Sequence, residues 1–218
     1  VLYSSYDPNF SDEPVDRDTE DTTAFVEYNL DSADSELINL TARLQYKKEV
    51  IDIRSLTGET GIFDADHQTT TYSLRVTNQA AFNTGSLSHD LLTGIEIGQR
   101  ERTSYADGTT TNDISAPGGT DDYVAVFFTD EIEIGDALTV TPQARYEKQT
   151  LTSYDNEAGF SRGRPVPAIP DGTEFKKDAL TGALSAHYEL TDAVAVFGTV
   201  AYNENLPILD DIRGAFAR

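Results

Sequence analysis

The connections between the strand-like segments of this chain alternate between short and long. The short ones are Asp31–Glu36, Thr84–His89, Gly135–Ala137 and Thr191–Ala193, and the long ones are Arg54–Gln68, Ala106–Thr120 and Asp155–Glu174. An up-and-down antiparallel sheet gives this rhythm when its two ends face different surroundings, with tight turns at one end and long loops at the other. The rhythm therefore constrains both the topology and the orientation of the sheet.

The segments between these connections are expected to be strands, and several are far longer than the roughly 5–6 residues of an average soluble strand. They are Thr22–Leu30, Leu37–Ile53, Thr69–Asn83, Asp90–Tyr105, Asp121–Ile134, Leu138–Tyr154, Phe175–Leu190 and Val194–Glu204. Such lengths are expected of tilted strands that cross a bilayer and protrude beyond it.

Apolar and polar residues alternate along these segments, which indicates sheet faces of opposite character. In the second segment the apolar face carries Ile38, Leu40, Ala42, Leu44 and Tyr46, and the polar face carries Asn39, Thr41, Arg43, Gln45 and Lys47. Many apolar faces end in aromatic residues: Tyr28, Tyr46, Tyr72, Phe82, Tyr123, Tyr146, Tyr188 and Tyr202. Aromatic girdles at both membrane interfaces are typical of transmembrane barrels. The pattern therefore favours a membrane barrel over a soluble sheet.

The composition excludes several classes of function. The net charge is −22, with 38 acidic and 16 basic residues, so nucleic acid is a poor partner. There is no Cys, and the three His residues are dispersed, which gives no metal cluster. No nucleophile elbow, zinc-protease motif, phosphate-binding loop or dinucleotide fingerprint is present. We therefore expect a binding protein with no enzymatic activity, no cofactor and no metal site.

Three segments resemble TonB-dependent outer-membrane receptors. The hairpin Asp122–Glu147 turns at Gly-Asp-Ala-Leu and returns as Leu-Thr-Val-Thr-Pro-Gln-Ala-Arg-Tyr, with Gln143 where that family usually has Gly. The segment His89–Glu96 is similar to the family's His-x-Leu-x-x-Gly-x-Glu strand. Val196–Pro207 resembles the strand that ends in Phe-Arg-Ala-Pro, although the Arg is missing.

The resemblance implies a barrel of about 22 strands with an N-terminal plug. We therefore expect residues 1–218 to be a partial barrel domain, all-β and antiparallel, with about eight strands, without the plug and the C-terminal strands. The implied function is TonB-dependent uptake of ferric siderophore or haem at the bacterial outer membrane. The implied partners are the TonB system, through the plug, together with outer-membrane lipid and lipopolysaccharide.

Candidate ligand-binding residues lie in the long connections. His67 ends the first of them, where an imidazole could coordinate haem iron. Arg162 and Arg164 lie in a Pro-rich loop, where a guanidinium fork could bind an anionic siderophore. An exposed, solvated loop explains the same residues without a ligand, so both interpretations stay open.

A second set of candidates follows from the polar face of the strands. We expect Arg43, Arg75, Arg145 and His187 to face the barrel lumen, where they would line the channel or contact the plug. His89 is expected near a turn, as a hydrogen-bonding lumen or turn residue.

Two other functions remain compatible with the sequence. One is a self-contained eight-stranded outer-membrane barrel with a structural or adhesive role, in which the first and eighth strands would pair. The other is a soluble acidic β-sandwich that binds carbohydrate or calcium, which would have a dry core between two sheets.

Overall fold

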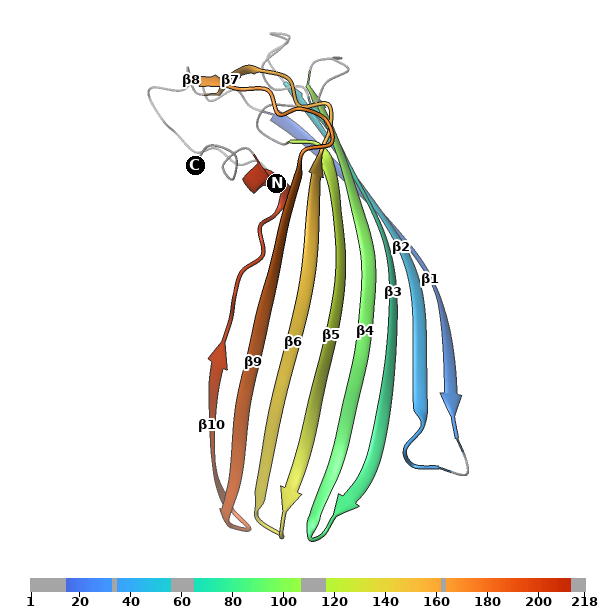
Figure 1. Cartoon of the computed structure of the whole chain (residues 1–218), viewed down its shortest axis with the longest axis vertical. Coiled ribbons are helices and arrows are strands. Elements are labelled where there is room, and N and C mark those ends of the chain that lie inside the picture. The colour runs from blue at the N-terminus through green and yellow to red at the C-terminus, as the bar shows by residue number, and fades with distance from the viewer. Residues whose placement is uncertain (1–14, 33–34, 56–64, 107–116, 162–163, 213–218) are drawn as a thin grey trace.

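The computed structural model describes residues 15–32, 35–55, 65–106, 117–161 and 164–212. They form one eight-stranded antiparallel sheet and one two-stranded hairpin (Figure 1). The strands are β1 (Val15–Asp31), β2 (Asn39–Ser55), β3 (Ala65–Thr84), β4 (Leu87–Ala106), β5 (Gly119–Ile134), β6 (Leu138–Ser153), β7 (Gly159–Ser161), β8 (Arg164–Val166), β9 (Glu174–Thr191) and β10 (Val194–Tyr202). A short 3-10 helix, η1, spans Leu209–Asp211. In the described ranges, no helix is both long and apolar enough to cross a membrane.

The large sheet has the order β1-β2-β3-β4-β5-β6-β9-β10, so each strand pairs with its neighbours in sequence. This confirms the predicted all-β, up-and-down topology. Among the described strands, β1 and β10 are the two edges and do not pair with each other. A closed eight-stranded barrel would need that pairing. A sandwich would need a second large sheet, whereas the described residues form a single large sheet.

Several strands extend beyond the predicted bounds at the long-connection end. β3 begins at Ala65, so the prediction that His67 ends a loop was wrong: it lies inside β3, opposite Ser104 of β4. These strand ends are polar on both faces and show no alternation. Backbone pairing with two neighbours holds them in the sheet, and such pairing does not need an alternating pattern.

The one-to-one register brings residues of like polarity together across the sheet. Val76 of β3 lies between Ala42 and Ile95, and Ile95 in turn pairs with Val126. Side chains on this apolar face are exposed; Val126, for example, is 50% exposed. A continuous exposed apolar face on a sheet marks contact with a membrane or another apolar partner.

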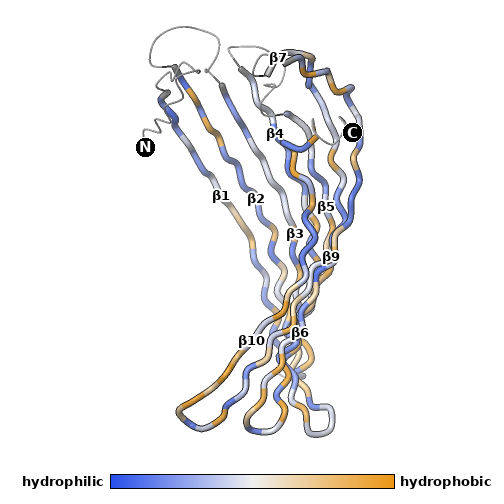
Figure 2. Tube along the Cα trace, turned by 90° about the vertical axis from the view of Figure 1, so that its left-hand side faces the viewer, coloured by the Kyte–Doolittle hydropathy of each residue, from blue (hydrophilic) through white to orange (hydrophobic). Residues whose placement is uncertain are grey.

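The apolar face forms a band at the turn end of the sheet. On β4 it extends from Leu87 to Ile97, which at about 3.3 Å per residue and a tilt of about 40° corresponds to roughly 25 Å. In Figure 2 hydrophobic residues are concentrated in the lower hairpins, and β10 is hydrophobic over much of its length. This height equals the apolar band of a transmembrane barrel.

At the other end, the sheet is capped by a small hydrophobic cluster on its polar face, which we call the mouth cluster. Its members are Leu151, Ile169, Leu209 and Ile212, with Phe175 packed against it. Arg102 of β4 ties η1 to the sheet, because its Nη1 lies 2.6 Å from Asp210 Oδ1. The segment after β10 thereby folds back over the polar face of β4–β6.

Asn156 joins two long connections at this end. It is only 3% exposed. Its Nδ2 donates to the carbonyl of Gly118 at 2.8 Å and to Ser153 Oγ at 2.8 Å, while its Oδ1 accepts from the Gly118 backbone N–H at 3.0 Å. One buried amide therefore satisfies backbone groups from segments 38 residues apart in sequence.

An ionisable pair lies on the apolar face near the turns. His89 Nδ1 is 2.9 Å from Asp130 Oδ2, and the two side chains are 12% and 15% exposed. The His89 ring stacks on Phe82 at a centroid distance of 4.7 Å. The expectation that His89 is a turn or lumen residue was wrong, because β4 begins at Leu87 and the register places His89 opposite Phe82.

We predict that His89→Leu destabilises the protein by about 3–5 kcal/mol, because it leaves a carboxylate without its partner in an apolar setting. The double variant His89→Leu/Asp130→Leu should be neutral or more stable than the wild type, since it removes both polar groups. Urea unfolding of the purified protein in detergent measures both effects. Equal stability of the single variant and the wild type would contradict this role for the pair.

Candidate functional site

Two glycines on the polar face of β4 make room for two aromatic rings from β5. Gly94 pairs with Phe127, and Gly98 pairs with Tyr123. A Cβ at Gly94 would lie 2.3 Å from Phe127 Cζ, and a Cβ at Gly98 would lie 2.4 Å from the Tyr123 hydroxyl. Both rings therefore lie across the neighbouring strand, at positions where any larger residue would exclude them.

The Phe127 ring is flanked by two guanidinium groups from different strands. Arg75 Cζ of β3 lies 4.7 Å from the ring centroid, and Arg145 Cζ of β6 lies 5.8 Å from it. Cation–π contacts of this kind fix the planes of the arginines and leave their N–H groups able to bind oxygen.

The two arginines differ in how they are paired. Arg145 Nη2 lies 2.6 Å from Glu147 Oε2, and its Nη1 lies 3.2 Å from Glu96 Oε2. Glu96 also accepts a hydrogen bond from the Tyr123 hydroxyl at 3.2 Å. Arg75, in contrast, has no ion pair among the residues that the structure describes. Its direct cross-strand neighbour, Glu96, contacts Arg145 and Tyr123, so Arg75 lies opposite a carboxylate with which it forms no ion pair.

A hollow of about 350 Å³ opens beside these side chains. Its lining includes Arg75, Phe127, Gln143, Arg145, Thr181 and Asn203. The hollow combines one aromatic face, cationic groups, an amide and a hydroxyl. This chemistry suits an anionic or carbonyl-bearing group that also has a flat apolar part.

The structure places the other predicted lumen residues on the same polar face but outside this hollow. Arg43 pairs directly with Arg75, lies over the Phe25 ring at 4.1 Å, and approaches Glu27 Oε2 at 3.9 Å. His187 lies near the turn end of β9, opposite Thr139. Their roles in lining a channel stay predictions.

The three predicted loop ligands do not form one site in the described residues. His67 hydrogen-bonds through Nδ1 to Ser104 Oγ within the sheet. Arg164 lies in β8, where its backbone pairs with Ser161. Arg162 lies outside the described residues. No group of three or more His, Cys, Asp or Glu residues that could hold a metal ion occurs in the described part of the chain.

Two groups near the mouth cluster have raised pKa values. Burial raises the pKa of Asp121, which is 4% exposed at the start of β5. Burial and the neighbouring Glu101 raise the pKa of Tyr154, whose hydroxyl donates to Glu101 Oε1 at 2.9 Å. Asp121 is on the polar face, so the mouth end of that face is partly shielded from water, whereas Glu101 is on the same side of β4 as Ile97.

Sequence reasoning found both arginines but missed Phe127, Glu96 and the two glycines. One signal was available: Gly94 and Gly98 are four residues apart, as are Tyr123 and Phe127, and both pairs lie on one face of adjacent strands. The long connection Ala106–Thr120 joins these two strands, so the sequence does not fix their register, and the shared spacing was a hint without a definite pairing.

The apolar outer band, the polar inner face and the short-turn and long-loop ends together define a section of a transmembrane β-barrel wall. Residues 2–217 match the family model described as TonB dependent receptor-like, beta-barrel. The chain belongs to this family, as predicted. In transmembrane barrels the apolar face is the outer side and the polar face is the interior side. A comparison with curated proteins finds no match.

Solved receptors show the same fold. The hemophore receptor HasR of Serratia marcescens, a double mutant in complex with its hemophore HasA and heme, shares 16% identity with a TM-score of 0.64, covering 86% of this chain and 30% of that chain. The ferric-catecholate import receptor Fiu of E. coli K12 in its open form shares 16% identity with a TM-score of 0.65, covering 89% of this chain and 37% of that one. The chain thus spans about a third of the length of these receptors.

We predict that Gly94→Val displaces Phe127 and destabilises the protein by about 1–3 kcal/mol, the usual result of overpacking. The double variant Gly94→Val/Phe127→Ala should recover part of this loss, because the ring that clashes is gone. Gly198→Val is the matched control, since no atom lies within 4 Å of a Cβ at that position. Thermal unfolding of the four proteins in one detergent makes the comparison. A double variant no more stable than Gly94→Val would refute the proposed contact.

Proposed function

We propose that this chain forms part of the lumen wall of an outer-membrane receptor for TonB-dependent uptake of a ferric siderophore or haem. The observation that carries the proposal is Arg75, which lies against Phe127 at the edge of a lumen hollow without an ion pair among the described residues. Family membership supports the receptor class. The finer assignments of ligand, partner and location belong to the proposal.

An anionic, partly aromatic ligand fits the chemistry of this hollow. Ferric siderophores and haem both combine negative charge with flat or apolar surface, and the arginine–phenylalanine pair offers a partner for each. The receptors of similar fold are described as binding heme with a hemophore and as importing ferric catecholate. His67, Arg162 and Arg164 would contact the ligand at the entrance, before it reaches Arg75.

The proposed partners follow from the different character of the two faces of the sheet. The TonB system would act through a plug, and the lumen-facing Arg43, Arg145 and His187 would line the channel or contact that plug. Outer-membrane lipid and lipopolysaccharide would surround the apolar face. The bacterial outer membrane is thus the proposed location.

The orientation can be tested by labelling single cysteines, since the chain has none of its own. Ala168→Cys, exposed in the long connection between β8 and β9, should react with a membrane-impermeant maleimide on intact cells. Ser86→Cys, exposed in the turn between β3 and β4, should react only after the outer membrane is permeabilised. The reverse pattern would overturn the assigned orientation, and equal labelling of both sites would argue against an outer-membrane location.

For uptake, we predict that Arg75→Gln weakens the apparent affinity for the ligand about tenfold or more, because it removes a charge-assisted contact in the lumen. Radiolabelled iron uptake should be measured with a ferric catecholate and, separately, with haem. The cells should carry this protein as their single receptor for that ligand.

Arg100→Gln is the matched control, because Arg100 of β4 is on the same polar face as Arg75 but outside the hollow. Its uptake should stay within about twofold of wild type. Equal loss in both variants would indicate a general effect of lumen charge. No loss in either would contradict a role for Arg75 in ligand passage.

A further inference from the structure

Two buried oxygens on the polar face lack a hydrogen-bond donor near the mouth cluster. Asp121 of β5 is 4% exposed, and its Oδ1 has no partner in the described part of the chain. Gln149 of β6 is 7% exposed, and its Oε1 also has none there. The two side chains lie within hydrogen-bonding reach of each other. A proton on Asp121 would therefore supply a donor where two acceptors now meet.

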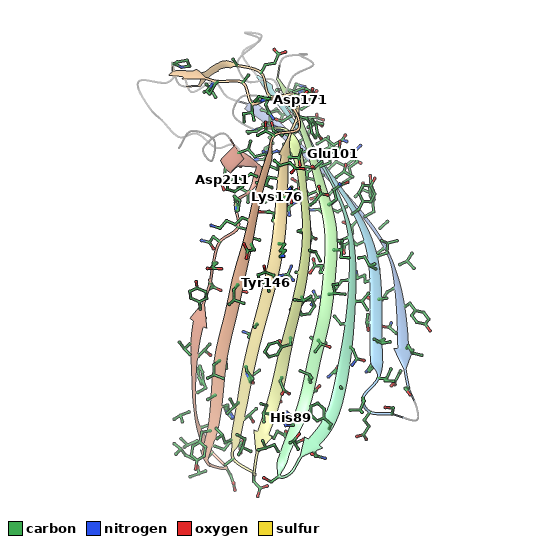
Figure 3. All side chains as sticks on the ribbon, in the orientation of Figure 1. His89, Glu101, Tyr146, Asp171, Lys176 and Asp211 are labelled. Carbon is green, nitrogen blue, oxygen red and sulfur yellow. The ribbon has the colours of Figure 1, made fainter. Side chains whose placement is uncertain are left out.

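The segment after β10, residues 203–212, covers this place, and we call it the strap. In Figure 1 it runs upward from β10 beside β9 and ends in η1. Figure 3 labels Asp211 of η1, which lies at the upper end of the sheet. Near the start of the strap, Glu204 Oε2 accepts a hydrogen bond from the Leu180 backbone N–H at 2.7 Å. The strap is thus attached to β9 at its lower end, while its upper end rests on the mouth.

The upper end of the strap lies next to Asp121. Leu209 of η1 lies over β5, since its Cδ2 is 3.3 Å from the position of a Cβ at Gly119. Gly119 is two residues before Asp121 and is on the same face of the strand. Leu151, directly opposite Asp121 in the register, belongs to the mouth cluster together with Leu209. The apolar residues of the strap therefore help to shield the carboxylate from water.

The charged groups around Asp121 compensate its carboxylate only weakly. Arg100 is its direct partner on β4, but Arg100 Nη1 is 4.0 Å from Asp121 Oδ2 and the arginine side chain is 46% exposed. Arg102, further along the same face, is engaged by Asp210 of η1. The other charged groups nearby are Asp122 on the opposite face of β5, Glu147 of β6, Lys177 of β9 opposite Gln149, and Asp211 of η1. Burial therefore raises the pKa of Asp121.

Protonation of Asp121 and the position of the strap are linked. When the strap lifts, water reaches the carboxylate, and its pKa returns toward the ordinary aspartate value of about 3.9. The seated state, with its higher pKa, binds the proton more tightly, so protonation favours a seated strap. This stabilisation is complete below the pKa of the lifted state and is lost as pH rises through the raised pKa of the seated state.

We propose that Asp121 is a proton-binding site that controls the strap, which stays seated on the mouth while Asp121 is neutral and lifts more readily once Asp121 is ionised. A second hollow, of about 270 Å³, lies beneath the strap. Its lining joins strap residues to two residues of the hollow beside Arg75: Glu204, Asn205, Leu206, Arg145 and Thr181. The strap therefore covers an approach to that hollow. This regulation by pH goes beyond the proposed function, because it needs no ligand.

The test follows the strap with a nitroxide spin label on Ile208→Cys, since Ile208 is 51% exposed and the chain has no native cysteine. Electron paramagnetic resonance of the purified receptor in detergent, from about pH 4 to about pH 8, gives the fractions of mobile and immobile label. The ratio of mobile to immobile label should rise with pH. The rise should be about tenfold for each unit by which seating of the strap raises the pKa of Asp121.

Asp121→Asn keeps the shape of the neutral acid and should leave the strap seated across the whole pH range. Asp122→Asn is the matched control, because Asp122 is the next residue but points to the opposite face, where it accepts a hydrogen bond from Gln99. This control should keep the full pH response.

Two further variants test the direction of the effect. Asp210→Asn removes the partner of Arg102 and should increase the mobile fraction at neutral pH, the opposite of Asp121→Asn. Gln149→Glu adds a second carboxylate beside Asp121, so it should move the response to higher pH. If Asp121→Asn does not fold, the direction of the shift in Gln149→Glu decides the test.

Three results would overturn the proposal. They are an unchanged pH response in Asp121→Asn, a mobile fraction that falls as pH rises without that change, and equal loss of the response in Asp121→Asn and Asp122→Asn. The measurement needs neither an iron ligand nor energy coupling. A failed uptake experiment with Arg75→Gln would therefore leave this test valid, and a failed strap test would leave the uptake proposal standing.

Discussion

The pairing of backbone groups between neighbouring strands is the constraint on which the other features depend. In hydrocarbon, every N–H and C=O must find a partner within the protein, and an antiparallel sheet with one-to-one register satisfies this. The ladder between β3 and β4 runs from Ala65↔Ala106 to Thr84↔Leu87 without an irregularity. A slip by one residue would turn Arg75 to the apolar face, because side chains alternate between the two faces. The register therefore determines which residues lie on each face of the sheet.

Much of the fold could be predicted because short-range sequence patterns determine it. Period-two alternation gives the strands and their two faces, and turn residues such as Gly85 and Gly135, both with positive φ, give the short connections. The same reasoning places Arg75 and Arg145 on one face. It does not show that Arg145 is held by two carboxylates while Arg75 forms no ion pair, because the register sets Glu96 opposite Arg75 and only the side-chain directions bring Glu96 to Arg145.

The features that sequence reasoning missed depend on long-range contacts. His89 looked like a turn residue because its segment begins with polar groups, but the ladder extends past it and brings it against Phe82 and Asp130. The mouth cluster joins residues of β6, the long connection before β9 and the segment after β10. Those connections are rich in Gly, Asp and Pro, a composition that predicts surface loops and does not reveal the few apolar residues that pack together.

Small residues give this wall its two recesses, one on each side. Thr181 and Ala183 flank Gly182 in sequence and border the hollow on the polar face, while Gly182 lies with Ala144 in the floor of a second recess on the apolar face. Because adjacent residues of a strand point to opposite faces, a short run of small side chains leaves a recess on each side of the sheet. The wall between β6 and β10 is therefore recessed on both faces at neighbouring residues. A large side chain at any of these three positions would remove a recess from one side without touching the other.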